Sequence, residues 1–344
     1  MDNLESKKTI YNLSKELGLA PSTISKALNN QPGISEEKRR LVMEYAKKVK
    51  YVPTSSARML KAKNSYSLGV IYSETLNIGL EHPFFSPVLE NFKKYVEKEG
   101  YEICFISAKL GNFGTTYKEF IQNKRLSGVL IVAGNNEDEM LLDIIKSKNI
   151  KVVSTDYINE DVVTILSDNV DGTRQAIKSL YESGIRKIGM VLGPNNQFVF
   201  DERKKAFLEI TKELNIEVKP SWLQTTKDYL YSDGYAAMKR MIEETKGDLP
   251  EAVFTVSDMY ALGIIAALED KGYHVPKDVS VVGFDDIEFA KYIKPSLSTV
   301  RQNTKEIGTI AAKTLIDMIN DEYEEKYDKK IRIPATYIKR GSTI

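Results

Sequence analysis

The sequence predicts a small all-helical N-terminal module followed by a larger α/β core built on parallel sheets. In residues 1–50, apolar side chains recur at helical spacing within short segments. From Ser67 onward, apolar runs of strand length alternate with amphipathic segments, a pattern typical of parallel sheets covered by helices. The chain has 344 residues, 42% of them hydrophobic, and is long enough for two or three domains with sizeable cores.

Two short helices joined by a tight turn are predicted between residues 9 and 29, with Thr9 as the N-cap of the first and Gly18 at its end. Each helix has one apolar face, formed by Ile10, Leu13 and Leu17 in the first and by Ile24, Ala27 and Leu28 in the second. The other face of the second helix carries side chains that can bond base edges and phosphates, namely Ser22, Thr23, Ser25, Lys26 and Asn29. This is a helix-turn-helix pattern, with the second helix as the candidate for a major groove. The alternative is a plain αα-hairpin packed in a larger domain.

A third helix is predicted from Ser35, whose hydroxyl can cap it while Glu36 and Glu37 place negative charge in the first turn. Its expected apolar stripe is Leu41, Val42, Tyr45, Ala46 and Val49. After Pro53, a helix of under about two turns is expected over 55–60, which is too short to be stable in isolation. We therefore predict a headpiece over 1–50, a hinge helix and linker over 51–64, and a core over 65–344.

The charge of the chain is unevenly distributed. The formal net charge is +1, yet residues 1–64 hold thirteen Lys or Arg against six Asp or Glu, a balance of +7, and the remainder has a balance of −6. A basic module on a mildly acidic body indicates a polyanionic partner for the module alone. A charge run is usually just a solvated face, but here it coincides with the helix-turn-helix pattern.

The core is expected to contain at least seven strands and five amphipathic helices. The strands are predicted over 67–73, 101–107, 128–133, 151–155, 187–193, 252–257 and 279–284, and the helices over 84–99, 171–184, 198–214, 229–244 and 259–272. About 280 residues exceed what a single core of this kind usually holds, so two lobes are expected. Ligands of such folds bind beyond the carboxyl ends of the strands.

Several classes of protein are disfavoured by the sequence. No apolar run is long enough to span a bilayer, and the N-terminus lacks the apolar segment of a signal peptide, so a cytoplasmic location without membrane contact is expected. The single cysteine, Cys104, lies in an apolar run and is expected to be a buried strand residue. His82 and His274 lie far apart, so no metal is expected. No P-loop, nucleophile elbow or cofactor motif is found, and an enzyme is not expected.

Taken together, the motifs and their order resemble the LacI/GalR family of bacterial transcription regulators over essentially the whole chain. The matching residues are Thr9, Leu13, Gly18, Thr23, Ile24, Ser25, Lys26 and Asn29 in the headpiece, 51–53 and 57–60 in the hinge, and 83–85, Asp168, Asn169, Gly172, Arg203, 256–258, 261–263 and 281–286 in the core. The resemblance implies a two-lobed core like that of periplasmic binding proteins. The first lobe is expected over about 65–165 and 299–325, and the second over about 166–298 and 326–344.

The resemblance also implies a DNA-binding surface on double-stranded operator DNA. Pro21, Ser22 and Lys26 would approach base edges, whereas Thr9, Thr23, Asn29 and Tyr51 would anchor the phosphate backbone. The alternative role of Lys26 is a phosphate contact. Leu60 would wedge between base steps, and Ala57 would let two hinge helices pair in a homodimer. In the alternative, Leu60 simply joins headpiece and core. No leucine heptad ends the chain, so a dimer is expected rather than a tetramer.

In the core, the resemblance implies an effector site for a small carbohydrate. Hydroxyl groups would be bound by Asp156, Arg203, Ser257 and Asp285, and the sugar ring would lie against Tyr229, Phe84 and Phe85. Arg203 and Asp285 are the main candidates, expected to face each other across the cleft. Each alternative is structural: Phe85 as a core residue, Asp156 as an exposed loop carboxylate, Asp286 as the N-cap of the next helix, and Asp168 with Asn169 as shapers of the crossover.

Three functional hypotheses remain open at this point. The first is a repressor whose affinity for operator DNA is set by a sugar, through a rearrangement of the lobes. The second is a global catabolite-type regulator controlled by a phosphocarrier protein or a purine corepressor. The third is a sugar-binding or enzymatic α/β protein with a structural N-terminal hairpin. Salt-sensitive DNA binding by the headpiece separates the third hypothesis from the other two.

Overall fold

The computed structural model describes residues 9–28, 32–49, 51, 65–72, 79–110, 113–134, 138–194, 197–323 and 329–344. The chain divides into two compact units, Met1–Tyr66 and Ser67–Ile344, which are described separately below. The predicted hinge over 51–64 lies outside the described residues except for Tyr51, and so do Asn29, Ala57 and Leu60. Among the described residues, no helix has the length and apolar character needed to cross a membrane.

The first unit contains the three predicted helices, α1 (Ile10–Leu17), α2 (Pro21–Leu28) and α3 (Glu36–Lys48). Thr9 caps α1 in a capping box with Asn12, and Gly18 ends α1 in the left-handed conformation that glycine adopts without strain. The buried side chains form one small core, made of Leu13, Ile24, Ala27, Val42 and Ala46. The prediction that Leu41 belongs to this core is wrong: its side chain is 47% exposed, because it lies off the stripe that α3 turns inward.

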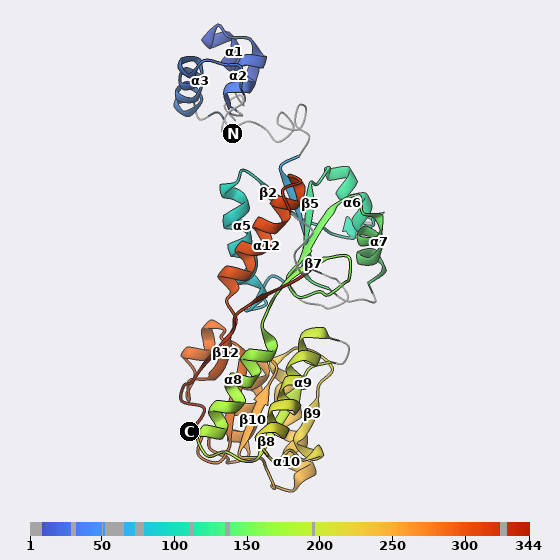
Figure 1. Cartoon of the computed structure of the whole chain (residues 1–344), viewed down its shortest axis with the longest axis vertical. Helices are drawn as coiled ribbons and strands as arrows, with labels where there is room; N and C mark the ends of the chain where they lie inside the picture. Colours follow the sequence, from blue (N-terminus) through green and yellow to red (C-terminus); the bar gives the residue numbers. More distant parts are fainter. Residues whose placement is uncertain are drawn as a thin grey trace, which may run out of the picture. The chain divides into compact units, whose positions relative to one another are not determined.

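The second unit begins with a lobe built on a six-stranded parallel sheet (Figure 1). In spatial order its strands are β13 (Lys330–Ile333), β7 (Val163–Ser167), β6 (Lys151–Ser154), β5 (Gly128–Ala133), β1 (Ser67–Tyr72) and β2 (Glu102–Phe105). Helices α5 (Phe85–Lys98) and α12 (Thr304–Ile319) pack together on one face of the sheet, and α6 (Tyr117–Lys124) and α7 (Glu139–Ser147) lie on the other. A short hairpin, β3 (Lys109–Leu110) with β4 (Phe113–Gly114), completes this lobe.

The second lobe repeats this plan. In spatial order its sheet comprises β14 (Thr336–Ile338), β12 (Ser298–Arg301), β11 (Ser280–Asp285), β10 (Ala252–Thr255), β8 (Ile188–Leu192) and β9 (Leu223–Thr225), with only β14 antiparallel among these strands. Its helices are α8 (Asn169–Glu182), α9 (Phe198–Glu213), α10 (Tyr231–Thr245) and α11 (Asp258–Asp270). Two single-turn 3₁₀ helices, η2 (Pro220–Trp222) and η3 (Glu288–Lys291), lie in its connections.

The chain passes between the two lobes three times, from β7 to α8, from β12 to α12 and from β13 to β14. The sheets place these crossings differently from the predicted lobe boundaries. Strand β12 pairs with β11 in the second sheet, so the chain returns to the first lobe after Arg301 rather than near 299. Strand β13 pairs with β7 in the first sheet, so the last crossing follows Ile333 rather than 325.

All seven predicted strands and all five predicted core helices are present, with ends shifted by a few residues. Cys104 lies in β2, as expected, but its side chain is only half-buried. Strands β7, β9, β12, β13 and β14 and helices α6, α7 and α12 were not predicted. Among the described residues, no cluster of His, Cys, Asp and Glu is arranged to hold a metal ion.

Candidate functional site

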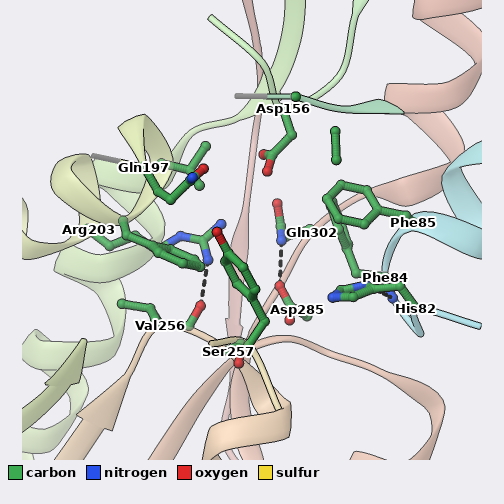
Figure 2. A pocket seen from close by; sticks show the side chains of 15 residues that line it. His82, Phe84, Phe85, Asp156, Gln197, Arg203, Val256, Ser257, Asp285 and Gln302 are labelled. Atoms are coloured by element: carbon green, nitrogen blue, oxygen red, sulfur yellow. Dashed lines mark hydrogen bonds between the residues drawn. The ribbon is translucent and has the colours of Figure 1, made fainter. Parts of the chain in front are cut away.

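A pocket between the two lobes collects all seven predicted effector residues (Figure 2). Phe84, Phe85 and Asp156 come from the first lobe, and Arg203, Tyr229, Ser257 and Asp285 from the second. The space they enclose measures about 600 Å³, including its opening to solvent. The remaining lining residues are His82, Ala133, Gly134, Gln197, Val199, Phe200, Val256 and Gln302. Both lobes therefore contribute polar and aromatic groups to one concave site.

Arg203 is the cation among the described lining residues, and its guanidinium is held by three contacts. Its Nε donates to Oδ1 of Asn169 at 2.9 Å, and its Nη1 donates to the carbonyl of Val256 at 2.6 Å. The guanidinium carbon lies 3.6 Å from the centre of the Phe284 ring, a cation–π contact. The side chain is 3% exposed and points into the pocket. Arg203 is therefore fixed before any ligand arrives, with further N–H groups left to donate.

Asp285 ends strand β11, where the parallel fold places ligand-binding groups. Its Oδ1 accepts a hydrogen bond of 2.6 Å from Nε2 of Gln302. Burial raises the pKa of Asp285 well above its ordinary value; the charge of Asp258 adds to the rise, and Arg203 opposes it. The backbone of Asp285 has a φ of 130°, an unusual conformation for a residue with a side chain.

Asp258 lies behind Asp285 and is fully buried at the start of α11. Its carboxylate accepts from the hydroxyl of Thr299 at 2.6 Å and from the backbone N–H of Ile287 at 2.9 Å. Gly283 makes room for it, because a Cβ there would lie 2.1 Å from Asp258 Oδ1. Burial raises the pKa of Asp258 to about 7. Asp258 thus braces the strand end and adds negative potential below the pocket.

Asp156 follows strand β6 in the first lobe and points into the pocket from the side opposite Asp285 (Figure 2). Its side chain makes no hydrogen bond to any residue that the structure describes. Burial raises the pKa of Asp156 to about 6, although the charge of Arg203 lowers it. The predicted pairing therefore needs correction: Arg203 and Asp285 both belong to the second lobe, and Asp156 is the charged group that faces them across the cleft.

Aromatic rings wall the pocket on both lobes. Phe84 and Phe85 lie with ring centres 5.0 Å apart, and both are almost completely buried, so they are core and pocket residues at once. Tyr229 lies 6.0 Å from Phe200, centre to centre. His82 lies 4.7 Å from Phe85, and its burial lowers its pKa to about 4, which keeps it uncharged.

The structure shows what Ser257, Asp168 and Asp286 contact within the protein. Ser257 lines the pocket, but its hydroxyl also caps α11 by accepting from the N–H of Tyr260 at 3.4 Å. Asp168 caps α8, as expected of a residue that shapes the crossover. Asp286 is not a helix cap, because Ile287 precedes the 3₁₀ helix η3; instead Asp286 forms ion pairs of 2.6 Å with Arg301 and Arg340. These partners are distant in sequence, so local pattern could not reveal them.

Four of the eight pocket residues that were not predicted from the sequence follow one rule. Ala133 with Gly134, Val256 and Gln302 stand at or just beyond the carboxyl ends of β5, β10 and β12, where ligands of parallel sheets bind. Applying that rule to every strand would have found them. The other four residues, His82, Gln197, Val199 and Phe200, lie in loops or at a helix start, and nothing in their local sequence marks them.

In the headpiece, α2 presents Pro21, Ser22 and Lys26 as exposed side chains and Thr23 as half-buried, while Ile24 and Ala27 face the core. Thr9 is exposed, and its hydroxyl is engaged with Asn12 in the cap of α1. Tyr51 packs against the headpiece core, and its N–H donates to the carbonyl of Ala46 at 2.9 Å. The polar face of α2 is thus exposed on the described part of the headpiece and can contact another molecule.

Comparison with known sequences shows similarity over nearly the whole chain. Residues 177–343 match the periplasmic binding protein-like domain family. The repressor PurR of Haemophilus influenzae is 28% identical over 340 residues, which cover 97% of this chain and 98% of that protein. The probable repressor ExuR of Bacillus subtilis is 29% identical over 324 residues, covering 93% and 94%. The ribose operon repressor of Haemophilus influenzae is 28% identical over 319 residues, covering 92% and 93%.

Solved structures share the fold. The lac repressor dimer bound to operator and the anti-inducer ONPF matches with a TM-score of 0.79 at 22% identity, covering 98% of this chain and all of that one. The complex of the regulator CelR with cellobiose matches with a TM-score of 0.72 at 24% identity, covering 97% and 99%.

A helix-turn-helix headpiece joined to a two-lobed core with a ligand pocket defines a DNA-binding transcriptional regulator with an effector-binding core. The predicted resemblance to the LacI/GalR family is confirmed, because the curated relatives include the repressors PurR and ExuR and the lac repressor shares the fold.

Proposed function

We propose that this protein is an operator-binding repressor whose DNA affinity is set by a small, uncharged carbohydrate bound in the pocket between the lobes. The observation that carries the proposal is the pocket itself, in which one guanidinium, two carboxylates and aromatic walls converge from both lobes. Carboxylates accept from sugar hydroxyls, Arg203 donates to them, and a ring such as Tyr229 can lie against the C–H face of a sugar.

The charges of the pocket support a neutral ligand. Asp156 and Asp285 are acidic, Arg203 is the cation among the described lining residues, and His82 is uncharged. Two of the donor groups of Arg203 are already used by Asn169 and Val256. A phosphate or uronate would add negative charge beside two buried carboxylates, which would have to take up protons to admit it.

On the DNA side, we propose the roles that the sequence predicts. Pro21, Ser22 and Lys26 would face base edges, and Thr9, Thr23, Asn29 and Tyr51 would contact phosphates. The exposed polar face of α2 supports this assignment. Leu60 as the wedge and Ala57 at the pairing of two hinge helices remain proposals that rest on the family resemblance. Two headpieces in a homodimer would require a pseudo-palindromic operator.

The regulatory mechanism would be linkage between two sites. A ligand that binds one arrangement of the lobes more tightly shifts the protein toward that arrangement, and the hinge segments couple it to DNA affinity. A regulator of this kind works where the DNA is, so we propose a cytoplasmic location. We also propose that the pocket binds its ligand without chemical conversion.

A thermal-shift screen of the full chain tests the effector. The panel holds the neutral sugars D-glucose, D-galactose, D-ribose and cellobiose, the anions D-glucuronate and glucose 6-phosphate, and the purines hypoxanthine and guanine. At one hundred times its dissociation constant, a ligand should add about 2.7 kcal/mol of stability. Stabilisation by a neutral sugar that is lost in Asp285→Ala is the expected result.

Stabilisation by a purine alone, or by a phosphocarrier protein alone, would replace the sugar hypothesis with the second one. Stabilisation by D-glucuronate or glucose 6-phosphate and by no neutral sugar would contradict the charge argument. The variant Lys205→Ala serves as the control, because Lys205 lies on the same helix as Arg203 but its side chain is 79% exposed.

The DNA-binding role is tested by the salt dependence of binding to a selected operator sequence. Each phosphate contact releases counterions, so removal of one should lower the slope of log K against log salt by about 1. If Lys26 contacts a base instead, Lys26→Ala should reduce discrimination between operators by about 1–3 kcal/mol and leave that slope nearly unchanged. An affinity for operator DNA that does not change with salt concentration would contradict the proposed role of the headpiece.

A further inference from the structure

A chain of four polar side chains runs from the first lobe to the pocket. Arg332, on β13 of the first sheet, donates from Nη1 to Oε2 of Glu202 at 3.1 Å and from Nη2 to Oε1 at 2.5 Å. Glu202 stands on α9 of the second lobe, directly before Arg203. Its Oε2 also accepts from Nδ2 of Asn169 at 3.0 Å, and Oδ1 of Asn169 accepts from Nε of Arg203 at 2.9 Å.

The orientation of the Asn169 amide follows from its two neighbours. A carboxylate can only accept, so the atom of Asn169 that faces Glu202 must be the NH₂ group. A guanidinium can only donate, so the atom that faces Arg203 must be the oxygen. Asn169 is fully buried, and its amide cannot exchange these partners for water. The acceptor oxygen of Glu202 and the donor N–H of Arg203 thus together fix which end of the amide meets Arg203.

We propose that Glu202 is a positioning residue for the ligand-binding group Arg203, acting through Asn169, and that Arg332 links this arrangement to the first lobe. The inference rests on the proposed function, because it assumes that Arg203 contacts the effector. It adds a residue outside the pocket lining and a physical route from the pocket to the contact between the lobes.

The exposures of the pair support this assignment. The side chain of Glu202 is 14% exposed and that of Arg332 is 34% exposed, so the two-pronged pair is partly shielded from solvent. If the lobes move so that Arg332 leaves, Glu202 keeps Asn169 but loses its charged partner. The position of the first lobe and the orientation of Arg203 are then coupled through the carboxylate of Glu202.

Three variants separate the parts of this arrangement. Glu202→Lys replaces the acceptor by a donor, so the NH₂ of Asn169 loses its acceptor and the amide is no longer held with its oxygen toward Arg203. Glu202→Gln keeps an acceptor oxygen for Asn169 but removes the charge. Arg332→Gln removes the ion pair with Glu202 and leaves Glu202, Asn169 and Arg203 unchanged. Glu213→Gln is the matched control, because Glu213 also lies on α9 and pairs with an arginine of α8, Arg174, at 2.7 Å, away from Asn169.

The first readout needs no ligand. In the full chain with ¹⁵N-labelled arginine, the Nε–H signal of Arg203 is assigned through its loss in Arg203→Lys, and its exchange with solvent is measured. Loss of the hydrogen bond to Asn169 should accelerate exchange about tenfold or more in Glu202→Lys. Exchange in Glu202→Gln, Arg332→Gln and Glu213→Gln should stay close to that of the wild type. Unchanged exchange in Glu202→Lys would overturn the proposal, and circular dichroism verifies that each variant is folded.

The second readout is the dissociation constant of the neutral panel sugar that stabilises the wild type, with D-ribose and cellobiose measured first. Glu202→Lys should weaken binding about tenfold, and Arg332→Gln about threefold, because Arg332→Gln keeps the acceptor oxygen of Glu202 for Asn169. Equal affinities in the wild type and in both variants would contradict the role of Glu202. If no panel sugar binds the wild type, the proposed function fails while the exchange measurement still decides this inference.

Discussion

The two lobes contribute unequal halves of the pocket. The polar groups of the second lobe are held by neighbours: Arg203 by Asn169 and Val256, and Asp285 by Gln302, which lies in the crossing segment directly after β12. In the first lobe, Asp156 makes no hydrogen bond to a described residue. The second lobe therefore holds a half-site that is already ordered, and the first lobe adds groups whose polar partners a ligand can supply.

This difference predicts different effects of substitutions in the two lobes on stability and on ligand binding. Side chains that folding already holds in place can bind a ligand without a further loss of conformational entropy. Their removal, however, also destabilises the folded lobe. A group that makes no hydrogen bond within the protein can contribute mainly to binding, because its removal breaks no hydrogen bond of the folded chain. Substitutions in the second lobe should thus change both stability and binding, whereas substitution of Asp156 should mainly affect binding.

The largest effect is expected for Arg203→Ala. Removing this guanidinium leaves Asp285 and Asp156 buried without their compensating cation, which should destabilise the chain by about 3 kcal/mol. Binding of the stabilising panel sugar should weaken by about a hundredfold or more, since a charged hydrogen-bond donor is lost. Urea denaturation and calorimetry measure the two quantities, with Lys205→Ala as the control. An unchanged free energy of unfolding would refute the view of the second lobe as a prebuilt half-site.

A smaller and more selective effect is expected for Asp156→Ala. Sugar binding should weaken about tenfold through the loss of one charged acceptor, while the melting temperature should stay constant or rise. Calorimetric titration and thermal melting of the same sample test both parts. A large drop in melting temperature would show that Asp156 has a structural role, and the contrast between the lobes would fail.

Asp285→Asn should raise stability at alkaline pH. The pKa of Asp285 is raised in the folded protein, so its contribution to stability is fully present below the unfolded pKa and is lost as pH rises through the folded pKa. At pH 8 the amide removes this cost and should add about 1 kcal/mol, a rise of about 2–4 °C in melting temperature. At pH 4 the gain should vanish, because the wild-type carboxyl is then largely protonated when folded. A gain that is equal at both pH values would argue against burial as the cause.

The sequence predicted the elements whose environment is uniform along the chain. Strands such as β5 and β11 are buried on both faces, so their apolar runs stand out. Strand β12, with Ser298, Thr299 and Arg301 among its four residues, has no such run and owes its place to neighbours in space. The same holds for β13 and β14, which determine where the chain crosses between the lobes.

The candidate site also divides into features that the local sequence indicates and features that depend on neighbours in space. The seven residues predicted for the effector line one pocket, because the family resemblance carries their positions in the chain, and their roles toward a ligand remain predictions. What pattern could not show is which lobe each group belongs to and what it touches. Asp286 was misassigned because its partners Arg301 and Arg340 lie 15 and 54 residues away. Gln302 and Glu202 carry no local signal, yet their hydrogen bonds hold Asp285 and the amide that orients Arg203.

The smallest expected effect is the pH dependence of sugar binding, and it isolates the first lobe most directly. Burial raises the pKa of Asp156 to about 6, so this carboxyl takes up a proton as pH falls from 7 to 5 and loses its charge as an acceptor. Affinity for the stabilising neutral sugar should fall a few-fold, by about 1 kcal/mol or less, over that interval. Calorimetric titration at pH 5, 6 and 7 measures the slope, which should flatten in Asp156→Asn. D-Glucuronate should show the opposite slope, because protonation of the pocket removes the repulsion that disfavours an anion. Parallel slopes for the sugar and the anion would mean that the first lobe does not act through its carboxylate.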